Sequence, residues 1–421
     1  MNSAAAKPAS RPLSEWILIV LVALLPLMKP AVAYPMILSD LVFLALAAAM
    51  ALDVLRRRLA IRWNRGFLVP AAYVAALAPS LLVTPDWHES AFKLATTAYL
   101  ASLAVATALV VRDEVILKRV ILAWLAATAA VVILAIVSLL TFLVSPEGAI
   151  YAYSRSHFGT LPAGHYPRLN LTFFNANMAC NYLTVSLGML LIAYQQSWLG
   201  KTIACLLLGG ILIAALATLS PGLGGIALAI GMAAFFLWRS RLPLSAGILA
   251  AAAALLAAAF TPFVDTTAHG FAVPGTALVL APAARLGLWT AGIAEFLKHP
   301  LIGHGIGVDA VSVYSTLPSG DFMHVSDAHN VFLNVAAQAG LVGLAGLLML
   351  MAYAMRLSRA NSVALVLGLT FLNGFGYQGL TGSFEDTRHL WVLFGILIAA
   401  ARLPLIRRDG NSHRAGAPSP C

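Results

Sequence analysis

Long apolar runs recur along nearly the whole of this chain, and they constrain its fold more than any other feature. A run of about eighteen residues or more can cross about 30 Å of hydrocarbon as a helix. Lipid offers the backbone no hydrogen-bond partners, and the runs are too long for barrel strands, so only helices suit them. Apolar residues make up 61% of the 421 residues and charged ones 10%, whereas soluble domains carry about 25% charged residues. The sequence therefore predicts an all-α polytopic membrane protein.

The apolar runs predict about twelve transmembrane helices in a single integral membrane domain over residues 1–421. The first run is flanked by Lys7 and Arg11, and we interpret it as an uncleaved helix in preference to a signal peptide. The predicted spans lie near 14–33, 36–54, 66–84, 91–111, 120–145, 176–195, 202–219, 222–238, 244–262, 329–355, 362–379 and 389–406.

Most of the Lys and Arg residues fall in the loops of one side and in the two termini. This asymmetry is the positive-inside signal, so we expect both termini to be cytoplasmic. The net charge of +10 then needs no nucleic-acid partner. The tail over 409–421 is composed of polar, glycine and proline residues and is predicted to be disordered in the cytoplasm.

The opposite side carries one large polar segment over 261–328, between the ninth and tenth spans. All histidines except His413 fall on this side. Within the segment, Ala284 to Lys298 has apolar residues at helical spacing and a weakly polar opposite face, which is typical of an interfacial helix lying on the bilayer. The run from Gly303 to Gly307 follows it and predicts a turn.

His329 is the sharpest candidate for chemistry. Ser326 or Asp327 can cap the tenth helix, which leaves His329 in its first turn. There the positive end of the helix dipole favours a neutral ring, and a neutral imidazole can accept a proton from a hydroxyl as a general base. The alternative is a histidine that merely sits at a helix end.

Arginines on the external side are a second signal, because the positive-inside bias should have removed them. Arg168, Arg285 and Arg388 stand near the mouths of predicted helices, and Arg155 lies farther into a loop. A guanidinium forms paired hydrogen bonds to phosphate, so converging arginines can bind a diphosphate. Pairing with carboxylates or lipid headgroups is the alternative for each of them.

Metal chemistry is disfavoured by the sequence. His299 and His304 have no nearby third ligand, so we expect no metal and no other cofactor. The carboxylates of the large segment show no spacing that requires a glycosidase pair.

Several motifs in the large segment resemble the O-antigen ligase and polymerase superfamily. They are Arg285-Leu286-Gly287-Leu288-Trp289, then His299-Pro300-Leu301 with Gly303, Gly305 and Gly307, then His329-Asn330 followed by Gly340-Leu341-Val342-Gly343. The resemblance implies a C-type (GT-C) membrane glycosyltransferase in the bacterial inner membrane, with its active site facing the periplasm. Such an O-antigen ligase transfers a glycan, with inversion and without a metal, from undecaprenyl diphosphate to a hydroxyl of the lipid A-core oligosaccharide.

The resemblance also implies roles for individual residues. His329 is the expected general base, and Arg285 is expected to bind the diphosphate together with Arg168 and Arg388. Further substrate contacts are expected from Asn177, Asn330 and Trp289. The chain departs from the family at Thr218-Leu219-Ser220-Pro221-Gly222, where members often have Ser-Arg or Thr-Arg, so the cations beyond Arg285 stay open. Membrane lipids are further expected partners, and we expect a monomer.

Three other functions remain open. A Wzy-type O-antigen polymerase and a protein O-oligosaccharyltransferase share the chemistry and differ in the acceptor, about which the sequence says little. A transporter of lipid-linked glycans is a more remote alternative, because it predicts ionisable residues inside the spans, and here they collect at the span ends.

Overall fold

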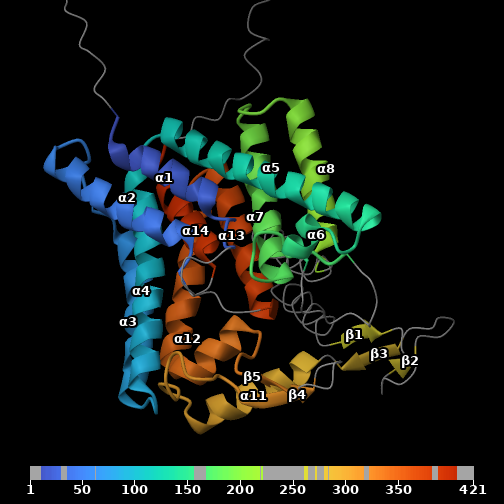
Figure 1. Ribbon diagram of the computed structural model, residues 1–421. Helices are drawn as coiled ribbons and strands as arrows, with labels where there is room; N and C mark the ends of the chain where they lie inside the picture. The colour runs from blue at the N-terminus through green and yellow to red at the C-terminus, as the bar shows by residue number, and fades with distance from the viewer. Residues whose placement is uncertain are drawn as a thin grey trace, which may run out of the picture.

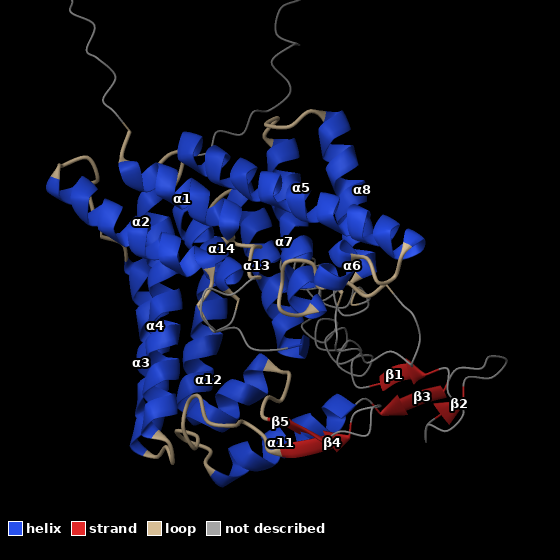
Figure 2. Ribbon diagram, viewed as in Figure 1, coloured by secondary structure: helices blue, strands red, loops and turns tan. Residues whose placement is uncertain are grey.

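The structure is a computed structural model, and it describes residues 11–29, 36–61, 63–155, 167–218, 220, 260–263, 271–272, 279–282, 284–316, 322–381 and 387–404. Most of the described residues are helical (Figures 1 and 2). The predicted span over 222–238, most of the span over 244–262 and the tail over 409–421 lie outside the described residues.

Within the described residues, six helical stretches are long and apolar enough to cross a membrane. They are α2 (Leu38–Leu55), the stretch 65–82 (η1, Arg65–Phe67; α3, Leu68–Leu77; η2, Ala78–Leu82), α4 (Trp87–Val110), α5 (Glu114–Val144), α7 (Ala176–Gln195) and α12 (Val331–Leu357). The other helices are α1 (Leu13–Leu24), α6 (Ala149–Ser154), α8 (Lys201–Ala217), α11 (Ala284–Lys298), α13 (Ser362–Thr381) and α14 (Arg388–Ala400). The predicted multi-pass, mostly helical architecture agrees with this arrangement.

Several predicted boundaries were wrong. The first helix ends at Leu24 and not near residue 33, because Pro26 has no backbone N–H to continue the ladder. The helix α5 starts at Glu114, where the Asp113 side chain accepts the Ile116 N–H at 2.9 Å as an N-cap; the prediction had started it at 120. Residues 260–262, predicted as the end of the ninth helix, belong to a strand.

The cationic loops predicted for one side of the membrane meet at one end of the bundle. Arg112 in the α4–α5 connection forms an ion pair of 2.6 Å with Glu15 of α1. The same guanidinium donates to the Arg58 carbonyl after α2 at 3.0 Å. Arg402, after α14, lies 4.8 Å from the centre of the Phe67 ring. Three connections and the start of α1 therefore share this end, which we call the Glu15 end.

The large polar segment lies at the opposite end, which we call the α11 end (Figure 1). It contains α11, as predicted, and also strands, which the all-α prediction missed. A three-stranded antiparallel sheet has the order β1 (Phe260–Phe263), β3 (Val279–Pro282), β2 (Phe271–Ala272). A second sheet pairs β4 (Val313–Thr316) with β5 (Phe322–Val325). Short pairs of this kind satisfy backbone groups where the chain has left the helix bundle.

The helix α12 is broken at Gly340, and the glycine turn fills the break. Gly340 has φ 63° and ψ −161°, so the helical ladder stops there. The N–H groups of Leu341 and Val342 donate to the carbonyls of Pro300 and Leu301 at 2.8 and 3.2 Å. A Cβ at Gly340 would overlap the Leu301 backbone. The turn predicted at Gly303–Gly307 is confirmed, and Pro300 and Leu301, directly before it, supply the acceptors that the broken helix lacks.

The core of the bundle is packed through aromatic side chains. Trp124 of α5 stacks on Tyr182 of α7 with ring centres 5.3 Å apart, and both are fully buried. The Trp124 indole donates to the Ser186 hydroxyl at 2.9 Å. A buried indole N–H needs such an acceptor, so this pair fixes α5 against α7.

Candidate functional site

His329 lies immediately before the start of α12 and not in its first turn. The helix begins at Val331, and Asn330 is the N-cap, its side-chain oxygen accepting the N–H groups of Phe332 and Leu333 at 3.0 and 3.2 Å. The predicted capping by Ser326 or Asp327 was therefore wrong. His329 has φ 50°, which is uncommon for a residue with a side chain, and its side chain is 45% exposed.

Asp327 organises the turn that carries His329. One carboxylate oxygen accepts the His329 backbone N–H and the Asn334 amide N–H, the second at 2.8 Å. The Asn334 side-chain oxygen in turn accepts the Ala328 N–H at 2.9 Å. The same carboxylate oxygen lies 3.8 Å from the His329 Nδ1. The left-handed backbone is thus held by a closed network, and the ring faces the Asp327 carboxylate.

Arg168 and Asn177 meet at the turn that follows α8. Arg168 Nε donates to the Thr218 carbonyl at 3.3 Å, and the Ser220 hydroxyl contacts the Asn177 side-chain oxygen at 2.7 Å. Burial lowers the pKa of Arg168 from its ordinary value, and the nearby Tyr377 opposes that shift. The structure therefore brings these two predicted residues together at the turn where the family pattern departs.

Arg388 is engaged by a carboxylate. Its Nε and Nη2 donate to the two oxygens of Asp40 at 2.6 and 2.9 Å, and the Tyr99 hydroxyl donates to the same carboxylate at 2.6 Å. The Arg388 and Asp40 side chains are only 13% and 12% exposed. This is the carboxylate pairing that the sequence left open as an alternative, and a role for Arg388 in diphosphate binding stays a prediction.

The remaining predicted residues are on α11. Arg285 is its second residue, but its side chain lies outside the described part of the structure, so the predicted diphosphate contact stays a prediction. The Trp289 Nε1 is buried and has no hydrogen-bond partner among the described residues. An indole donor in that position can serve a ligand.

Sequence reasoning missed Lys29 and Asp40. The Lys29 ammonium donates to the Asn170 side chain at 2.9 Å, two residues from Arg168, and burial lowers the pKa of Lys29. Asp40 is the third residue of an apolar helix. A carboxylate at that place calls for a partner, and this was the signal that could have found the ion pair.

The helix α13 connects the His329 turn with the Arg168 turn. The Phe332 ring, in the first turn of α12, lies 5.7 Å from the Phe375 ring of α13. Tyr377, two residues further along α13, lies near enough to Arg168 to oppose the lowering of its pKa. Both turns therefore border the same end of α13.

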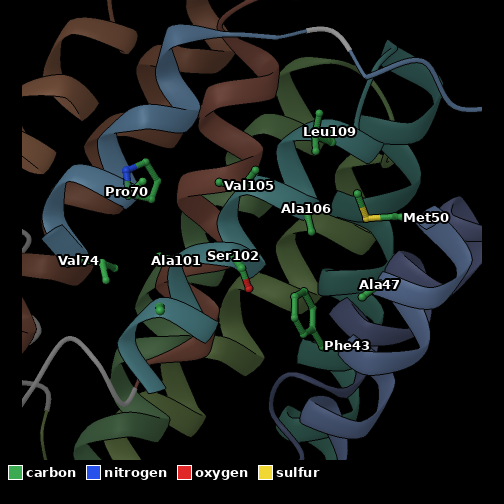
Figure 3. Close-up of a pocket in the computed structure, with 12 residues that line it drawn as sticks. Phe43, Ala47, Met50, Pro70, Val74, Ala101, Ser102, Val105, Ala106 and Leu109 are labelled. Atoms are coloured by element: carbon green, nitrogen blue, oxygen red, sulfur yellow. The ribbon is translucent and has the colours of Figure 1, made fainter. Parts of the chain in front are cut away.

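An apolar groove of about 600 Å³ lies between α2, α3 and α4 (Figure 3). Phe43, Met50, Val74 and Leu109 contribute to its walls, and Ser102 is the polar residue among those that line it. Such a lining accommodates hydrocarbon and offers almost nothing to a charged headgroup. Among the described residues, no group of three or more His, Cys, Asp or Glu side chains is arranged to hold a metal ion.

The fold and the site define a mostly helical, multi-pass membrane protein. In it a histidine whose ring faces a carboxylate lies just before the start of a broken helix. Comparison with known families makes the assignment more specific. Residues 203–348, about a third of the chain, match the family model described as O-Antigen ligase. Among curated proteins there was no significant match.

The matched region includes some of the predicted site residues and not others. Arg285, Trp289, His329 and Asn330 fall within 203–348, as does the Gly340 break. Arg168, Asn177 and Arg388 lie outside it.

Proposed function

We propose that this protein is an O-antigen ligase. It transfers a glycan from undecaprenyl diphosphate to a hydroxyl of the lipid A-core oligosaccharide, at the periplasmic face of the bacterial inner membrane. The observation that carries the proposal is His329, a half-exposed histidine inside the family-matched region, held at the head of α12 with a carboxylate 3.8 Å from its Nδ1.

In this proposal His329 is the general base. The acceptor hydroxyl oxygen attacks the anomeric carbon of the glycan, and the bond from that carbon to the diphosphate oxygen breaks. The hydroxyl proton passes to Nε2 of His329, because Nδ1 lies toward Asp327. The carboxylate then stabilises the imidazolium that forms. Attack from the face opposite the leaving group inverts the anomeric configuration.

The diphosphate leaves with its negative charge, and cations stabilise it. We assign this task to Arg285 and Arg168, with Arg388 as a further candidate once it exchanges Asp40 for phosphate. Arg168 is supported by its position: it is half-buried shortly before the start of α7, and its Nε donates to the Thr218 carbonyl. A guanidinium suits a phosphate because it presents paired donors in one plane. Asn177, Asn330 and Trp289 are proposed further contacts to substrate.

The proposal is tested by complementation of a ligase-deficient strain with a compatible core. We expect the unmutated protein to restore an O-antigen ladder and His329→Ala to abolish it, because removal of a general base costs about 10²- to 10⁴-fold in rate. His324→Ala is the control, since His324 is another exposed histidine of the same segment. A full ladder from His329→Ala at equal protein level would remove the base assignment.

A second arm separates the functions that share this chemistry. If the unmutated protein restores glycan polymerisation in a polymerase-deficient strain and fails in the ligase-deficient one, the acceptor is a growing glycan and the ligase proposal is wrong. Glycosylated periplasmic protein in place of glycosylated lipid A-core would equally overturn it.

A further inference from the structure

His304, in the glycine turn, makes a contact that its neutral form cannot make. Its Nδ1 lies 3.0 Å from the Ala337 carbonyl oxygen, and its Nε2 lies 2.9 Å from the Asp309 carbonyl oxygen. A carbonyl oxygen only accepts hydrogen bonds, whereas a neutral imidazole has a single N–H. Both bonds therefore form only when the ring carries two protons.

The two carbonyls are available for structural reasons. The Ala337 carbonyl has lost its helical partner, because the Leu341 N–H donates to Pro300 across the Gly340 break. It accepts instead the backbone N–H of His304 at 3.2 Å as well as the ring. The imidazolium thus supplies a donor to an acceptor that the broken helix leaves without its helical bond.

Charged and titratable groups lie around His304 on several sides. Glu295 of α11 has a carboxylate oxygen 3.7 Å from Nδ1, and its pKa is lowered, first by the hydrogen bond from Lys298 and also by the charges of His304 and Lys298. The His299 ring centre is 6.4 Å away, and the Asp309 carboxylate is turned toward His324 at 3.7 Å. Lys93 and Glu89 of α4 flank Gly307, beyond the ring.

The two carbonyl contacts of the His304 ring, which we call the clamp, act on the turn that carries His329 from two directions. On one side it holds Ala337, which belongs to the short first part of α12 that begins at Val331. On the other it holds Asp309, and the next residues, Ala310 and Val311, donate to the Ser326 carbonyl at 2.9 and 3.3 Å. Ser326 directly precedes Asp327, whose carboxylate fixes His329.

We propose that His304 is a positioning residue whose protonated ring clamps the turn against the broken helix and so sets the place of His329. This inference rests on the proposed function, because His329 is taken as the base. Loss of the second proton on His304 releases one of the two bonds and loosens the His329 turn. Transfer therefore has an alkaline limit set by His304, in addition to any acid limit set by His329.

The protonation state is measured without any activity, by ¹⁵N NMR of the full-length protein labelled at histidine, in lipid nanodiscs. The signals of His304 are those absent from His304→Gln. We expect both ring nitrogens to be protonated at neutral pH, and we expect the His329 signal to shift in His304→Gln but not in His88→Gln, since His88 is an exposed residue of α4. One protonated and one unprotonated nitrogen at His304 overturns the proposal, and so does an unmoved His329 signal.

The positioning role is measured by the pH dependence of transfer from a lipid-diphosphate donor. His304→Gln should lower kcat about 10- to 100-fold, with the KM for donor little changed, because a displaced base costs rate more than binding. It should also lose the alkaline limb that His88→Gln keeps. Glu295→Gln is the second variant, used where His304→Gln does not fold. It should move the alkaline limb of the pH profile to lower pH, since the imidazolium loses its neighbouring carboxylate.

The outcomes separate the two proposals. Absence of transfer by the unmutated protein refutes the proposed function, while the NMR measurement still decides the state of His304 and its coupling to His329. A His304→Gln enzyme with unchanged kcat and an unchanged alkaline limb refutes the positioning role alone.

Discussion

Replacing Gly340 by Ala tests whether the glycine turn and the broken helix act as one unit. The backbone at Gly340 has φ 63° and ψ −161°, a conformation that costs a residue with a side chain about 1–3 kcal/mol. The new Cβ would also overlap the Leu301 backbone, so the turn must move away. The N–H groups of Leu341 and Val342 would then lose their acceptors, at about 1–3 kcal/mol each.

Together these losses are on the order of 5 kcal/mol, a large share of the 5–15 kcal/mol that stabilises a typical domain. The assay is hydrogen–deuterium exchange of the purified protein, read by mass spectrometry on peptides covering Leu341 and Val342. We expect protection there to fall by roughly 10³-fold, because every 1.4 kcal/mol is a factor of ten. Thermal stability, read by size-exclusion chromatography after heating, should fall in parallel.

Gly209→Ala in α8 is the matched control, because a Cβ there meets nothing within 4 Å. It should be neutral or slightly stabilising, since Ala is the better helix former by about 1 kcal/mol. Unchanged protection and unchanged thermal stability in Gly340→Ala would refute the interlock between the turn and α12.

Three further predictions concern charged residues. Asp40→Asn should destabilise the protein by about 3 kcal/mol, because it leaves a mostly buried guanidinium without its carboxylate. Adding Arg388→Met should recover part of this loss in thermal unfolding. Additive effects of the two substitutions would contradict the pairing. Arg168→Ala should weaken transfer strongly. Arg168→Lys should restore it only in part, because an ammonium point charge replaces a planar guanidinium with paired N–H donors. Equal kinetics of the Lys variant and the unmutated protein would argue against paired phosphate contacts. The pKa of Glu295 is lowered below its ordinary 4.5. The stability that Glu295 contributes is therefore present above pH 4.5 and is lost as the pH falls through the pKa of the folded protein. Acid unfolding of Glu295→Gln should lack this pH-dependent loss, and an acid profile identical to that of the unmutated protein would disprove the prediction.

The helices were predictable because their signal is composition over a long window. A described helix overlaps each predicted span outside 222–262, since a run of apolar residues in lipid has one way to satisfy its backbone. Their ends were less predictable, because an end is set by single residues. Asp113 starts α5, and the sequence offers several equivalent candidates near each boundary.

The residues of the candidate site stay a prediction, and their geometry could not be predicted from the sequence. His329 was selected from its neighbours, but Asn330 is the cap, and Asp327 instead holds the turn through Asn334. Asp, Asn and Ser all cap helices well, so the sequence could not choose among them. The break in α12 was hidden for another reason. Gly340 alone resembles a tolerated helix glycine, and the carbonyls that accept the Leu341 and Val342 N–H groups belong to Pro300 and Leu301, far earlier in the sequence.

The ion pair between Asp40 and Arg388 joins residues 348 positions apart, and this separation bears on biogenesis. Asp40 enters the membrane with one of the first helices, while its counter-charge is synthesised with the last one. Until α14 is in place, the nascent protein carries an acidic group at the mouth of an apolar helix without its arginine. A chain truncated anywhere before Arg388 therefore keeps a carboxylate at the start of α2 that lacks its counter-charge.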